Sequence, residues 1–179
     1  MAVFSQALIF KRGRVWLFQC ALWLGIFAVN FSQATHFSRF ACQNITPPLQ
    51  WYSWQDAYST ALAQKKIILL HVYTDWCFWC KKMEKETFES PIITTFLDSF
   101  FVTTKLNPEV ANKYVYKNKE YTARELFFKL ADDQAGTYPT LIIIIPSENA
   151  YFDKVYTLVG YFSAKELLAL LKDIKKRNP

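Results

Sequence analysis

The hydrophobic pattern in the middle of the chain alternates between helical and strand-like segments. Residues 54–65 carry apolar side chains at helical spacing, which predicts an amphipathic helix covering one side of a sheet. These apolar positions are Trp54, Ala57, Tyr58, Ala61 and Leu62. Residues 67–73 are apolar almost without a break, which is typical of a strand buried on both faces. A helix followed by a buried strand indicates a layered structure.

The same alternation continues to the end of the chain. A helix is expected from Cys77 to Glu89, where Ser90 and Pro91 interrupt it and start a shorter helix through Leu97. The later elements expected are a strand at 100–106, a helix at 123–131, strands at 140–145 and 154–159, and a helix at 163–175. Residues 107–122 are rich in Tyr, Lys and Asn without clear periodicity, and we expect an exposed loop there. This order predicts an α/β fold with a mixed central sheet flanked by helices.

A basic and then apolar segment precedes this pattern. Residues 11–14 read Lys-Arg-Gly-Arg, residues 15–29 are apolar, and residues 32–34 supply small side chains where a signal peptidase reads them. We expect a signal peptide cleaved after Ala34. An uncleaved membrane anchor over residues 15–31 is the alternative, because that run approaches the roughly 17 residues of a short spanning helix. Both interpretations place the rest of the chain outside the cytoplasm.

The expected organisation has three parts. Residues 1–34 form the signal peptide or anchor, residues 35–50 a linker, and residues 51–179 one domain. Lipid attachment at Cys42 is disfavoured by the charge and large ring that precede it, which leaves Cys42 as an odd thiol able to pair between chains.

Composition and charge exclude two classes of protein. A hydrophobic content of 52% in 179 residues is ample for a packed core, which excludes a largely disordered chain. The net charge of +6 comes mostly from four basic residues before Asp56, and the remainder holds 17 basic against 15 acidic residues. Because no basic stripe with interleaved aromatic residues remains, nucleic acid is not an expected partner.

Cys77 and Cys80 are separated by two residues at the junction of the expected strand and helix. A thiol at the start of a helix faces unpaired backbone N–H groups that favour the thiolate, and the second thiol one turn later can close on it. We therefore expect Cys77 to be the nucleophile and Cys80 the resolving thiol of a disulfide exchange. Zinc binding is disfavoured because no second closely spaced cysteine pair is present, and a purely structural bridge because it closes so short a loop.

Residues 66–88, KIILLHVYTDWCFWCKKMEKETF, resemble the thioredoxin superfamily, and most closely the C-terminal periplasmic domain of DsbD-type thiol:disulfide interchange proteins. The segment Thr137-Tyr138-Pro139-Thr140 is similar to the family's cis-proline loop, and Gly160-Tyr161 before the last helix also fits. The resemblance covers roughly residues 52 to 176. It implies that Pro139 is cis and faces the cysteines, with the backbone of Tyr138 free to pair with an extended substrate.

Two ionisable residues relate to the same resemblance. His71 stands where these families usually carry a buried Asp, and it is either a general base near neutral pH or a core residue. Glu84 matches a family acid near the active site, although an exposed helical Glu explains it nearly as well.

The residues between and before the cysteines also differ from those of well-known relatives. Phe78 and Trp79 supply no imidazole to stabilise a Cys77 thiolate, which favours a reductant or a middling redox potential. Trp76, Phe78 and Trp79 are candidates for a protein-docking patch, although Trp76 can equally pack beside the active site.

The sequence predicts an exported, periplasmic thiol:disulfide oxidoreductase that acts on protein thiols and disulfides. Its redox-active group is the Cys77–Cys80 pair, with no dissociable cofactor and no metal expected. A reducing role needs a separate membrane electron donor, and membrane contact is expected only through an uncleaved N-terminal segment. The alternatives are a protein disulfide oxidase or isomerase, and a binding or chaperone module without turnover.

Overall fold

The computed structural model describes residues 47–147 and 153–178. The signal segment, its cleavage site, Cys42 and residues 35–46 of the expected linker lie outside the described residues. Within the described residues no helix is both long and apolar enough to cross a membrane. Leu49, at the end of the expected linker, packs against the core of the domain.

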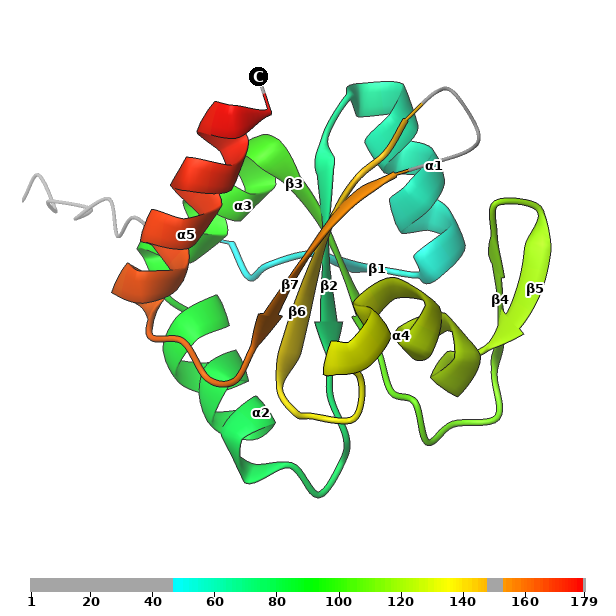
Figure 1. Ribbon diagram of the computed structural model, residues 1–179. Helices are drawn as coiled ribbons and strands as arrows, with labels where there is room; N and C mark the ends of the chain where they lie inside the picture. The colour runs from blue at the N-terminus through cyan, green and yellow to red at the C-terminus, as the bar shows by residue number, and fades with distance from the viewer. Residues whose placement is uncertain (1–46, 148–152, 179) are drawn as a thin grey trace, which may run out of the picture. The chain divides into compact units, whose positions relative to one another are not determined.

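A five-stranded mixed sheet forms the centre of the domain (Figure 1). In spatial order its strands are β1 (Trp51–Tyr52), β3 (Phe101–Leu106), β2 (Ile67–Val72), β6 (Thr140–Ile145) and β7 (Lys154–Val159). The first three strands run parallel, and β6 and β7 run antiparallel to their neighbours. All six residues of β2 are buried, as its unbroken apolar pattern predicts.

Helices cover both faces of the sheet, which confirms the predicted α/β fold (Figure 1). One face carries α1 (Trp54–Gln64) and α4 (Ala123–Ala131), followed by the short 3₁₀ turn η2 (Asp132–Gln134). The other face carries α2 (Phe78–Met83), its π-helical continuation η1 (Glu84–Phe88), α3 (Pro91–Phe100) and α5 (Ala164–Arg177). Because side chains alternate along a strand, Ile68 and Leu70 join the first core cluster, and Ile67 and Leu69 join the second.

Local sequence signals explain where these helices begin. Ser53 caps α1 by accepting the Asp56 N–H, and Thr122 and Ser163 form capping boxes at the starts of α4 and α5. Pro91 occupies the first turn of α3, where its missing N–H costs no helical hydrogen bond. α3 continues to Phe100, one turn beyond the expected end.

The expectation of a loop over residues 107–122 is wrong in its second half. Residues Lys113–Tyr116 and Lys119–Thr122 form strands β4 and β5 of a separate two-stranded antiparallel hairpin. Its turn residues Lys117 and Asn118 have φ values of 51° and 61°, the positive values that a tight hairpin turn requires. Glycine, the usual signal for such a turn, is absent from this segment.

A buried carboxylate ties this hairpin to the rest of the domain. The Asp153 side chain, just before β7, is 0% exposed and accepts hydrogen bonds from the hydroxyls of Tyr58 and Tyr116, each at 2.9 Å. It also accepts the Ser147 N–H at 2.9 Å and pairs with the Lys117 ammonium at 2.8 Å. The carboxylate therefore has a donor from α1, from the hairpin and from the end of β6.

Candidate active site

Cys77 and Cys80 form a disulfide at the start of α2, which leaves the sheet just beyond the end of β2. Cys77 is the N-cap of the helix, and its Sγ accepts the backbone N–H of Cys80 at 3.1 Å. The Cys77 N–H in turn donates to the Thr74 carbonyl at 3.2 Å, and this bond holds the turn at residues 74–77 that precedes the helix. The two sulfurs and the first turn of the helix are therefore held together as the spacing predicts.

The loop before β6 is the second part of the site. The Tyr138–Pro139 peptide bond is cis, and the Thr140 hydroxyl donates to the Thr137 carbonyl at 2.7 Å. The Gly160 N–H donates to the Pro139 carbonyl at 2.8 Å, so the end of β7 holds this loop. Gly160 has a φ of 98°, a conformation that other residues rarely adopt.

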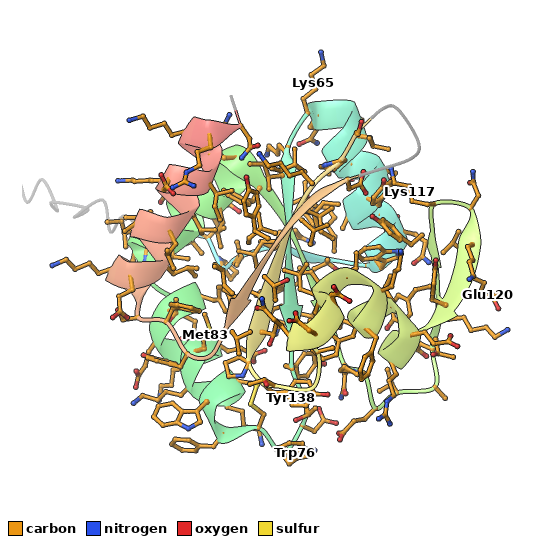
Figure 2. The ribbon with its side chains drawn as sticks, in the orientation of Figure 1. Lys65, Trp76, Met83, Lys117, Glu120 and Tyr138 are labelled. Atoms are coloured by element: carbon orange, nitrogen blue, oxygen red, sulfur yellow. A yellow bond between two sulfur atoms is a disulfide. The ribbon has the colours of Figure 1, made fainter. Side chains whose placement is uncertain are left out.

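Aromatic residues stand immediately before Cys77 and between the two cysteines, and they pack in two groups. The Trp76 ring packs edge-on against Tyr138, with their centroids 5.9 Å apart, and both residues lie at the lower end of the molecule in Figure 2. Phe78 contacts Trp79, and Trp79 contacts Tyr161, in each case with centroids 5.5 Å apart. Trp76, Phe78 and Trp79 are all exposed.

His71 lies on β2 beneath this end of the molecule and is completely buried. Neither ring nitrogen has a hydrogen-bond partner among the described residues. Burial, with a further contribution from the Lys105 charge, lowers the pKa of His71 from 6.5 to about 3. The imidazole is therefore neutral at pH 7, and its 3.7 Å separation from the Glu84 carboxylate is a contact and not an ion pair.

Glu84 connects this buried residue to the surface. Its carboxylate pairs with the Lys105 ammonium at 2.6 Å, and Lys105 is the neighbour of His71 across the β2–β3 pairing. The Lys105 ammonium also lies 4.6 Å from the centroid of the Trp51 ring. A surface hollow of about 510 Å³ is lined in part by Trp51, Glu84 and Lys105, so this pair has access to solvent.

The sheet order, the flanking helices and the disulfide at the start of a helix define a thioredoxin-fold protein with a Cys-x-x-Cys site. The family model Thioredox_DsbH, described as a protein of unknown function, DUF255, matches residues 32–177. The chain belongs to this family. The predicted membership of the thioredoxin superfamily is thereby confirmed.

Individual relatives agree on the fold. A thioredoxin from Thermus thermophilus superposes with a TM-score of 0.55 at 19% identity, covering 72% of this chain and 88% of that protein. A structure titled DsbH Oxidoreductase gives a TM-score of 0.53 at 20% identity, covering 72% and 85%. Human spermatogenesis-associated protein 20 is 27% identical over 153 residues, which is 79% of this chain but 18% of the human protein. The chain thus spans less than a fifth of that curated relative.

The structure brings the predicted site residues into two groups. Cys77 and Cys80 form the disulfide, with Phe78 and Trp79 between them and Trp76 packed against Tyr138 of the proline loop, whereas His71 and Glu84 lie 3.7 Å apart in a separate cluster with Lys105. Sequence reasoning missed two contributors, Lys105 and Glu109, the latter accepting the Trp76 indole N–H at 2.9 Å. Lys105 had a weak signal, as the sole charged residue in the expected strand 100–106. No feature of the sequence pointed to Glu109, which lies in the expected loop.

Proposed function

We propose that this protein is an exported thiol:disulfide oxidoreductase that reduces or exchanges disulfides in periplasmic proteins. The observation that carries the proposal is the Cys77–Cys80 disulfide at the start of the active-site helix, with Cys77 Sγ accepting the Cys80 N–H at 3.1 Å. In the reduced protein the same N–H favours a Cys77 thiolate over the neutral thiol.

The proposed reaction proceeds through one mixed disulfide. The Cys77 thiolate attacks one sulfur of a client disulfide, forms a bond to it and releases the other client sulfur as a thiol. The Cys80 thiolate then attacks Cys77 Sγ, which releases the second client thiol and restores the Cys77–Cys80 bond. Two electrons and two protons pass from the protein to the client, so the cysteine pair is the only redox group required.

Supporting residues are assigned to positioning and proton exchange. Tyr138 and Pro139 shape the surface that receives an extended client segment next to Cys77. Between the two ionisable candidates, the low pKa of His71 favours Glu84 as the group that exchanges protons during the cycle, because Glu84 is partly exposed and paired with Lys105. His71 then acts as a neutral core residue.

The direction of transfer and the location are also part of the proposal. Phe78 and Trp79 place no imidazole beside Cys77, which supports a reductant supplied with electrons by a separate membrane donor. The basic and apolar segment at residues 11–34 supports export, with cleavage after Ala34 or retention as an anchor.

Trapping of clients tests the reaction. A Cys80→Ala variant cannot resolve the mixed disulfide, so exported proteins are expected to accumulate as Cys77-linked adducts that dithiothreitol releases. The matched Cys77→Ala variant should trap none, and equal trapping by both variants would contradict the proposal. Equilibration of the Cys77–Cys80 pair with glutathione gives the direction, because a potential near that of strong oxidants is incompatible with a reductant.

A further inference from the structure

Five aromatic residues belong to the segment from Trp76 to Cys80 or contact it, and we call them the aromatic frame: Trp76, Phe78, Trp79, Tyr138 and Tyr161. Three of them are unusually open, because Trp76 is 66% exposed, Phe78 69% and Trp79 49%. Large apolar side chains this exposed, gathered in one place on a protein surface, indicate a binding site. The frame is the part of the site whose purpose the exchange chemistry alone does not explain.

The rings of the frame are held in position by neighbouring side chains. On one side the Trp76 indole N–H donates to the Glu109 carboxylate at 2.9 Å, and the ring packs against Tyr138. On the other side the Lys82 ammonium lies 5.0 Å from the Trp79 ring centroid and 5.4 Å from that of Tyr161. Rings that are already ordered lose little conformational entropy when a partner covers them, which favours binding.

The depth of the disulfide determines what kind of partner can use this frame. Cys77 is 5% exposed and Cys80 is 1% exposed, so the sulfur of a partner has to come close to the protein surface at Cys77, whose neighbours in the sequence are the exposed Trp76 and Phe78. The residues next to the partner's cysteine are then brought close to the exposed rings of the frame. A cysteine within a protein segment can therefore contact the frame through its flanking residues, which a small thiol lacks.

Three charged side chains beside the frame, those of Glu109, Lys82 and Glu86, already have partners. The Glu109 carboxylate accepts from Trp76, and Lys82 lies over the two rings and 3.9 Å from the Glu86 carboxylate. Glu86 also accepts the Tyr161 hydroxyl at 2.8 Å. Apolar area, rather than an unpaired charge, is what these residues offer a client.

We propose that the aromatic frame selects client segments in which the residues next to the cysteine are bulky and apolar. This specificity rests on the proposed exchange reaction, in which Cys77 bonds to the client sulfur and Cys80 displaces it. Burial of a large apolar side chain against the frame lowers the free energy of the mixed-disulfide step.

Two peptides of equal length test the proposal. Each has one cysteine, flanked by Leu and Phe in the first and by Ser and Asn in the second, and each is supplied as its symmetrical disulfide. The reduced protein is expected to reduce the apolar peptide disulfide with a kcat/KM roughly tenfold higher. Equal values for the two peptides would overturn the proposal.

Variants locate the origin of the preference. A Phe78→Ser, Trp79→Ser double variant should bring the ratio of the two kcat/KM values close to one, whatever its overall rate. Ile92→Ser is the matched control, because Ile92 is 57% exposed but lies on α3 outside the frame, and it should keep the ratio. If the kcat/KM ratio is unchanged in the double variant, or falls equally in the Ile92→Ser control, the aromatic frame is not the source of the preference.

Glutathione disulfide separates this proposal from the exchange reaction itself. It has no bulky apolar flanks, so its reduction reports the cysteine chemistry without the frame. If the protein reduces glutathione disulfide and both peptides equally, the frame proposal fails and the exchange reaction stands. If it reduces none of the three, the proposed function fails as well.

Discussion

His71 and Asp153 are both completely buried polar side chains, but the protein accommodates them in opposite ways. Asp153 accepts from Tyr58, Tyr116 and Ser147 and pairs with Lys117. His71 has no hydrogen-bond partner among the described residues and is kept neutral by its lowered pKa. A buried charge is tolerated only when its bonding capacity is filled, whereas a neutral ring is tolerated at a smaller cost.

The difference separates two tasks of the fold. The Asp153 cluster joins α1, the β4–β5 hairpin and the end of β6, and it stabilises the structure. The His71 cluster lies beneath the active-site helix and ends in the partly exposed Glu84–Lys105 pair. The buried polar residue without hydrogen bonds, His71, is therefore the one that lies beneath the active-site helix.

Removal of the Asp153 carboxylate should have the largest effect on stability. Asp153→Ala leaves Tyr58, Tyr116 and Lys117 without their shared acceptor, and we expect a loss of about 3–5 kcal/mol in the free energy of unfolding. Urea denaturation measures it. Asp173→Ala is the control, because its ion pair with Arg177 lies on the surface, and it should cost less than about 1 kcal/mol. Equal losses in the two variants would remove the distinction between the clusters.

The burial of His71 should make the protein less stable as the pH is lowered. Its pKa in the folded protein, about 3, lies below the ordinary 6.5 of the unfolded chain, so the unfolded state takes up the proton first. The free energy of unfolding is therefore not reduced by His71 above pH 6.5, and it decreases as the pH falls toward 3. Between pH 7 and pH 5 we expect a decrease of about 2 kcal/mol.

A His71→Leu variant isolates this contribution from other acid-sensitive groups. It should be as stable as the wild type at pH 7, because the imidazole it replaces makes no hydrogen bond among the described residues. Its stability should then fall less steeply than that of the wild type between pH 7 and pH 5. Parallel pH curves would show that His71 is not held neutral.

The smallest effect is expected for Lys105→Met. Lys105 and Glu84 are 29% and 35% exposed, so the loss of their ion pair should cost less than about 1 kcal/mol. Because the Lys105 charge lowers the pKa of His71, the variant should raise that pKa, which NMR titration of the imidazole can follow. An unchanged pKa would mean that burial alone keeps His71 neutral.

The sequence predicted the elements that depend on local pattern. The unbroken apolar run predicted β2, the helical spacing of apolar residues predicted α1, and the two-residue spacing located Cys77 and Cys80. The β4–β5 hairpin was not predicted because Lys117 and Asn118 form its turn without glycine. Strand β1 was not predicted because it has only two residues. The partners of Asp153 could not be predicted, since Tyr58 lies 95 residues away and meets it only through the packing of α1.

The same limit applies within the candidate site. That His71 would be buried followed from the strand pattern, but its neighbour Lys105 follows from the pairing of β2 with β3, which is a long-range contact. The contact of Trp76 with Glu109 joins residues 33 positions apart through a loop without periodicity.

Gly160 and Tyr161 are consecutive, yet each contacts a different part of the candidate site. The Gly160 N–H holds the Pro139 carbonyl, while the Tyr161 ring packs on Trp79. A single peptide unit at the end of β7 therefore links the cis-proline loop to the aromatic residue that precedes Cys80. Lengthening or shortening β7 by one residue would shift the proline loop relative to the Trp79 ring, and so change which proteins the site accepts, with both cysteines left in place.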